Sequence, residues 1–166
     1  RMVQEVNGLI RAKRDGIFTI DLRLRPHGSA GPLAVSLESF VTYYGKGGSA
    51  HAYERLALVR LRAIGGDSEL GHRVERIRDD LVYFSKSIDL EELRRLRERQ
   101  FHEQSEPGVF NAKFSPGALV DLEYDVQILQ VMAGRDAATL RTPRLREALE
   151  GLAASGIITE GEGDRL

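Results

Sequence analysis

Apolar residues recur at helical spacing through most of the chain, from residue 36 to residue 152, and this pattern limits the fold class. Ser36 stands where a helix N-cap would stand, and Leu37, Phe40, Val41 and Tyr44 after it fall on one helical face. Comparable segments follow at 67–81, 89–101, 118–133 and from Thr142-Pro143 to 152. We therefore expect a mostly α-helical molecule.

The N-terminal part differs. Residues 17–24 alternate apolar and polar side chains, which predicts a β-strand that Pro26 ends. Residues 51–64 carry both a helical and an alternating pattern, and their length without turn residues favours a helix.

Composition excludes several kinds of site and partner. The chain has no cysteine, and its four histidines are scattered, so we expect no disulfide and no zinc site. No apolar run approaches the roughly 20 residues of a membrane-spanning helix, and the first residues lack the apolar stretch of a signal peptide. We expect a cytoplasmic protein with no membrane or nucleic-acid partner. Residues 1–62 hold ten Lys/Arg against five Asp/Glu, which suits an anionic ligand or is chance clustering on a solvated face.

Three groups of residues could carry chemistry. Alternation along the strand places Asp21, Arg23 and Arg25 on one face, where a carboxylate can hold Mg²⁺ and guanidinium groups can bind phosphate. Basic residues also lie in the segment Tyr53-Glu54-Arg55, at Arg60 and Arg62, and at Lys113, shortly before the helix that Gly117 opens. For each group the alternative is a surface network of ion pairs.

The segment 118–133 is apolar on two nearly opposite sides, so we expect that helix to pack on both. Glu123 lies between the apolar stripes, and Asp121 begins a second polar stripe. Glu123 is then either a structural anchor paired with an arginine or a group of the ligand site. We expect it to be substantially buried and to contact Arg60 or Arg62, so that it holds the arginine towards the nucleotide.

In order along the chain, these segments resemble the glutamine synthetase adenylyltransferase/adenylyl-removase family. The stretch 16–28, Gly-Ile-Phe-Thr-Ile-Asp-Leu-Arg-Leu-Arg-Pro-His-Gly, is similar to its strand motif D-x-R-L-R-P-x-G. Residues 53–62 are similar to W-E-x-x-A-L-x-R-A-R, with Tyr53 in place of tryptophan. Residues 111–127 are similar to the motif containing K-x-x-x-G-G and I-E-F, with Ala118 in place of the second glycine.

The resemblance implies an α+β, mostly α fold: the end of a nucleotidyltransferase sheet followed by a helical array. It implies a nucleotidyltransferase portion at 1–35 and a helical domain at 36–159. From the residues themselves we expect a frayed tail at 160–166. Asp21 matches the family's third metal-binding aspartate, and nothing in the sequence matches G-S-x-x-D-x-D, which supplies the other two. Glu54, Gly117, Asp121 and Glu123 are then structural or supporting residues.

As for function, the resemblance implies an internal fragment of an enzyme that uses ATP and Mg²⁺ to transfer AMP to a tyrosine of glutamine synthetase, or removes that AMP. The motifs do not assign the chain to the adding or the removing half. We expect the fragment alone to be inactive, because two-metal chemistry needs all three carboxylates. The alternatives are a non-catalytic helical module that docks glutamine synthetase or a PII-type regulator, and a divergent relative with another protein target.

Overall fold

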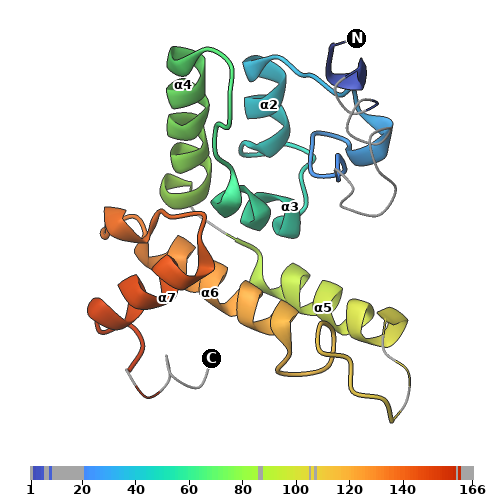
Figure 1. Ribbon diagram of the computed structural model, residues 1–166, viewed down its shortest axis with the longest axis vertical. Coiled ribbons are helices and arrows are strands. Elements are labelled where there is room, and N and C mark those ends of the chain that lie inside the picture. Colours follow the sequence, from blue (N-terminus) through green and yellow to red (C-terminus); the bar gives the residue numbers. More distant parts are fainter. Residues whose placement is uncertain are drawn as a thin grey trace. The chain divides into compact units, whose positions relative to one another are not determined.

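The computed structural model describes residues 2–5, 8, 21–85, 88–104, 106, 108–159 and 161 (Figure 1). The chain divides into two compact units, Arg1–Ala50 and His51–Leu166. This division falls at 50/51, whereas the sequence places a domain boundary at 35/36. That domain assignment stays a prediction.

In the first unit, the helix α2 (Leu37–Tyr44) supplies the buried aromatic residues of the described part, Tyr43 and Tyr44. It follows the short 3-10 helix η1 (Gly28–Ala30). The Ser36 side chain accepts a hydrogen bond from the Ser39 amide, which confirms the predicted N-cap. The first half of the predicted strand, residues 17–20, lies outside the described residues, and residues 21–24 are not in a strand. The described residues are therefore mostly helical, as expected, and they do not show the predicted end of a nucleotidyltransferase sheet.

The second unit is an array of helices (Figure 1). Its elements are α3 (Ala52–Ala57), η2 (Leu58–Arg60), α4 (Ser68–Asp79), the π-helical turn η3 (Asp80–Phe84), α5 (Leu90–Gln104), α6 (Leu119–Ala133), η4 (Ala138–Leu140) and α7 (Leu145–Ala154). The side chains of Asp67 and Asp89 accept from the amides of Leu70 and Glu92, so the predicted starts of α4 and α5 are confirmed.

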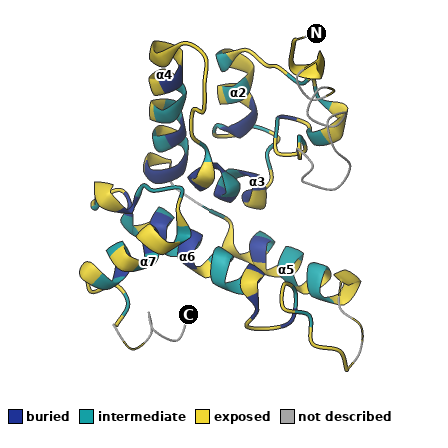
Figure 2. Ribbon diagram, viewed as in Figure 1, coloured by how far each residue is buried: buried dark blue, intermediate teal, exposed yellow. Residues whose placement is uncertain are grey.

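Helix α6 lies between two hydrophobic clusters, as its two apolar stripes predict (Figure 2). On one side Val126 is fully buried against Leu140 of η4 and against Ala148 and Leu152 of α7. On the other side the apolar stripe of α6 packs against a cluster of α3 and α5, formed by Ala52, Leu56 and Leu93. The stripe residues on that side are Tyr124, Ile128 and Val131. Met132 is the exception, because it is 69% exposed.

Two helix boundaries differ from the sequence expectation. Residues 61–64 are not helical, and their backbone instead meets polar side chains of α4. Helix α7 begins at Leu145 rather than at Thr142-Pro143. The Thr142 hydroxyl accepts from the Arg144 amide and bonds the Glu147 carboxylate, so it orders the turn before the helix without capping it. Among the described residues, no helix combines the length and the apolar character that crossing a membrane requires.

Candidate functional site

In the first unit, Asp21 pairs with Arg23. Both the backbone amide and Nε of Arg23 lie 2.9 Å from Asp21 Oδ1, and Nη2 lies 2.7 Å from Oδ2. Hydrogen bonds from the Arg23 side chain, and then from its amide, lower the pKa of Asp21 to about 2. Asp21 and Arg23 therefore do lie together, through a local contact between residues two apart rather than on one face of a strand, and the carboxylate is ionised at neutral pH.

Arg25 turns away from that pair and towards the loop that follows it. Its guanidinium donates to the carbonyl oxygens of Leu22, Gly31 (3.3 Å) and Ser29 (3.4 Å). Gly31 is required in this loop, because a Cβ atom there would lie 2.0 Å from the Pro26 carbonyl oxygen. The predicted role of Arg25 as a phosphate contact would compete with these bonds to the backbone.

The described residues do not by themselves fit a magnesium ion. They contain no group of three or more acidic, histidine or cysteine side chains placed to hold a metal. Both carboxylate oxygens of Asp21 already accept hydrogen bonds from Arg23. A metal at Asp21 would need further carboxylates from outside the described part of the chain.

In the second unit, Arg60 lies at the end of η2 and pairs with α6. Its Nη1 is 3.6 Å from Glu123 Oε1, with 47% and 33% of the two side chains exposed. The predicted contact between Glu123 and an arginine is thus confirmed. The predicted burial of Glu123 is met only in part, because 33% of its side chain is exposed, whereas Gln127 and Gln130 further along the same polar stripe of α6 are buried.

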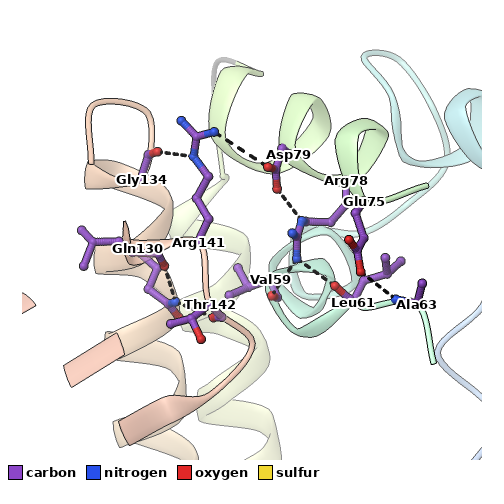
Figure 3. A network of polar contacts seen from close by, with 11 residues as sticks. Val59, Leu61, Ala63, Glu75, Arg78, Asp79, Gln130, Gly134, Arg141 and Thr142 are labelled. Atoms are coloured by element: carbon purple, nitrogen blue, oxygen red, sulfur yellow. Dashed lines mark hydrogen bonds and ion pairs between the residues drawn. The ribbon is translucent and has the colours of Figure 1, made fainter. Parts of the chain in front are cut away.

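A buried arginine of α4, Arg78, holds the backbone on both sides of Arg60 (Figure 3). Its Nη1 donates to the carbonyl oxygens of Leu61 (2.8 Å) and Val59 (3.5 Å), and its Nε donates to Asp79 at 2.5 Å. Arg62, the second basic residue of this segment, is exposed.

The loop that carries Lys113 is held by a second arginine, the largely buried Arg97 of α5. Arg97 donates to the carbonyl oxygens of Phe114 (2.7 Å) and Ser115 (3.2 Å) and forms a two-point pair with Asp121. Asp121 also accepts from the Gly117 amide at 2.7 Å. Burial alone would raise the pKa of Asp121, but the hydrogen bonds from Arg97 and from Gly117 outweigh it and lower that pKa.

The sequence suggests that Lys113 and free amides at the N-terminus of α6 could bind an anion together. The first amides of α6 are not free. The amides of Leu119 and Val120 donate to the carbonyl oxygens of Ala112 and Lys113. What remains for an anion is the Lys113 ammonium group, which lies 5.2 Å from the centre of the Phe114 ring. The predicted role of Lys113 stays a prediction on that narrower basis.

Glu54 supports α3 from within. It is 7% exposed, and its Oε2 accepts from the His51 amide at 2.9 Å, one half of a capping box. The start of α5 joins the same place, because Glu92 accepts from the His51 ring and from the Ala52 amide. These contacts give Glu54 a structural use at the junction of two helices.

Comparison with known proteins gives the family of the chain. The family model of glutamate-ammonia ligase adenylyltransferase matches residues 1–77. A bifunctional glutamine synthetase adenylyltransferase/adenylyl-removing enzyme of Streptomyces coelicolor is 36% identical over 96% of this chain. The chain belongs to the glutamate-ammonia ligase adenylyltransferase family.

Other members of this adenylyltransferase family align over nearly the same length. Proteins with the same description from Mycobacterium avium and Cutibacterium acnes are 33% and 34% identical, over 92% and 90% of the chain. The chain spans only about 16% of the length of the Streptomyces coelicolor protein.

Sequence reasoning missed the two arginines that organise these adenylyltransferase loops. Arg78 and Arg97 read as ordinary charges on polar helices, yet each follows an apolar residue of its own helix at helical spacing. Arg97 is four residues after the buried Leu93, and Arg78 is four residues after Val74. An arginine in register with an apolar stripe is the signal that could have identified them.

Proposed function

We propose that the chain is part of an enzyme that transfers AMP from ATP to a tyrosine of glutamine synthetase, or removes that AMP. The observation that carries the proposal is the 36% identity over 96% of the chain to a bifunctional adenylyltransferase/adenylyl-removing enzyme. In the first reaction the tyrosine oxygen bonds to the α-phosphorus of ATP and pyrophosphate leaves. In the second, inorganic phosphate takes up the AMP group, which releases ADP and the free tyrosine.

In this proposal the residues of the first unit act on the charges of the nucleotide. Asp21 supplies one carboxylate to a magnesium site that carboxylates outside the described residues complete. The exposed guanidinium of Arg23 is within reach of the same place, and a planar fork of N–H donors matches phosphate oxygens. Arg25 can join only by giving up part of its bonds to the loop backbone.

In the second unit, Arg60, Arg62 and Lys113 are the proposed phosphate contacts. Arg62 is exposed, and Arg60 is held by one loose, partly exposed ion pair that a phosphate group can replace. Asp121 and Glu123 then pair with arginines of the protein, Asp121 with Arg97 and Glu123 with Arg60.

The test combines the purified full-length protein with purified glutamine synthetase from the same organism. Labelled ATP should place AMP on glutamine synthetase, or AMP-modified glutamine synthetase should release ADP when inorganic phosphate is added. Absence of both reactions, with an active family member run in parallel, would contradict the proposal. Binding of glutamine synthetase or of a PII-type regulator without either reaction would instead support the non-catalytic docking module.

A further inference from the structure

Arg78 is the most buried arginine among the described residues, and it donates to three acceptors. The proposed chemistry gives it no role. It is 7% exposed, although arginine is rarely buried unless it is paired. Its partners are the carboxylate of Asp79, at 2.5 Å from Nε, and the carbonyl oxygens of Leu61 and Val59. Those two carbonyl groups flank Arg60.

A second residue of α4 holds the same segment. Glu75, one turn before Arg78, accepts from the Ala63 amide at 2.9 Å (Figure 3). Together the two side chains fix the backbone at residues 59, 61 and 63. The residues between these points, Arg60 and Arg62, are both exposed. The segment is thus fastened to α4 through its main chain, and its two basic side chains are left towards solvent.

The charge of Arg78 is balanced inside the unit. Asp79 lies against Arg78 through Oδ1, and its Oδ2 is 3.8 Å from Nη1 of Arg141. Arg141 in turn donates to the Gly134 carbonyl oxygen at 2.7 Å, directly after α6, and lies over the ring of Phe84. The clamp on residues 59–63 therefore rests on the same helix, α6, that carries Glu123, the partner of Arg60.

We propose that Arg78 is a positioning residue that sets the backbone of residues 59–63, so that Arg60 and Arg62 are presented to a phosphate-bearing ligand. Only a guanidinium can make this clamp, because its planar fork reaches a carboxylate and the carbonyl groups at once, whereas a lysine ammonium is a single point. The inference rests on the proposed function, since it takes Arg60 and Arg62 as phosphate contacts.

The experiment is a double-mutant cycle in the full-length enzyme, with the KM for ATP measured in the adenylylation assay and the KM for inorganic phosphate in the removal assay. We expect the double variant Arg60→Ala/Arg62→Ala to raise the KM of the affected reaction about tenfold, the scale of a lost phosphate contact. Arg78→Lys should raise the same KM about fivefold, and adding it to the double variant should change little, because residues that act as a unit are not additive. Arg76→Lys, on the exposed face of α4, is the matched control and should leave the KM unchanged.

The outcomes separate the two hypotheses. If Arg60→Ala/Arg62→Ala leaves both KM values unchanged, the phosphate role of these arginines fails, and the positioning role fails with it. If that variant raises the KM but Arg78→Lys leaves it unchanged, the positioning role alone is overturned. It is also overturned if the KM effects of Arg78→Lys and of the double variant are additive.

Should Arg78→Lys fail to fold, Glu75→Ala takes its place, because Glu75 holds the neighbouring amide from a more exposed position. A KM increase of about twofold to threefold with an unchanged melting curve is expected, since one of the fastening points is lost. An unchanged KM would count against the proposal.

Discussion

Arg78, which is buried, and Arg97, which is largely buried, make the same set of contacts although they lie on different helices. Each is paired with a carboxylate, Asp79 or Asp121, and each donates to two carbonyl oxygens of a loop that presents a basic side chain. A buried guanidinium without its carboxylate is costly, so the carboxylates are the residues on which loop geometry depends.

Asp121→Asn should therefore destabilise the protein at pH 7. The side chains of Asp121 and Arg97 are 28% and 13% exposed, so the loss should be on the order of 2 kcal/mol, below the value for a fully buried pair. The folded state lowers the pKa of Asp121 from 3.8, so its contribution is present above about pH 4 and disappears as the pH falls through the folded value. Urea unfolding at pH 7 and at pH 3 should show the difference between wild type and variant shrinking at the lower pH.

Asp125→Asn is the control for this measurement, because Asp125 lies one turn further along α6 and is exposed. Equal losses of stability in the two variants would show that the pair with Arg97 is not the cause.

Asp21→Asn tests the proposed metal ligand. In the full-length enzyme it should lower turnover of the affected reaction at least about 10²-fold, because charge stabilisation at a phosphoryl centre is lost. The melting temperature should hardly change, since Asp21 and Arg23 are exposed. Glu38→Gln, an exposed acid of the same unit, should leave turnover unchanged. Turnover within a few-fold of wild type for Asp21→Asn would reject Asp21 as a ligand.

At the scale of elements, local sequence rules predicted the helices well. Ser36, Asp67 and Asp89 begin their helices as caps do, and the two apolar stripes of α6 predicted two packing partners. These features depend on neighbours in sequence. The break after Arg60 depends instead on Arg78 and Glu75 of α4, which offer polar partners to residues 61 and 63, and no local pattern contains that information.

The candidate site was less predictable than the helices, for the same physical reason. The contact of Glu123 with Arg60 could be inferred from charge and from the packing of α6. The occupied N-terminus of α6 could not, because the acceptors of its first amides are carbonyl groups of the preceding loop, which every residue carries.

The two-sided packing of α6 can be tested with one pair of substitutions. Val126→Ala should lower the free energy of unfolding by about 2 kcal/mol, because Val126 is fully buried and a cavity would remain. Met132→Ala, on the same helix but 69% exposed, should change it by less than about 0.5 kcal/mol. Denaturant unfolding measures both, and comparable losses would contradict the placement of Met132 in solvent.

At the scale of the whole molecule, the chain contains part of the machinery that its family resemblance implies. No G-S-x-x-D-x-D motif occurs in its sequence, and the described residues hold no group of three metal-binding side chains. We therefore expect the 166-residue chain alone neither to adenylylate glutamine synthetase nor to remove AMP from it, because the two-metal reaction lacks carboxylates. Assays with labelled ATP and with AMP-modified glutamine synthetase check this, and turnover above a protein-free control would refute it.

The position of α6 between two hydrophobic clusters has a consequence for how the second unit opens. If α7 separated from α6, the apolar face between those two helices would be exposed to water. The same holds for the apolar face between α6 and the pair α3 and α5. The unit should therefore lack a partly unfolded form in which α6 is free, and it should open as one cooperative body. In hydrogen–deuterium exchange, the central amides of α6, around Val126 and Gln127, should exchange at the rate of global unfolding, whereas those of the Lys113 loop exchange sooner.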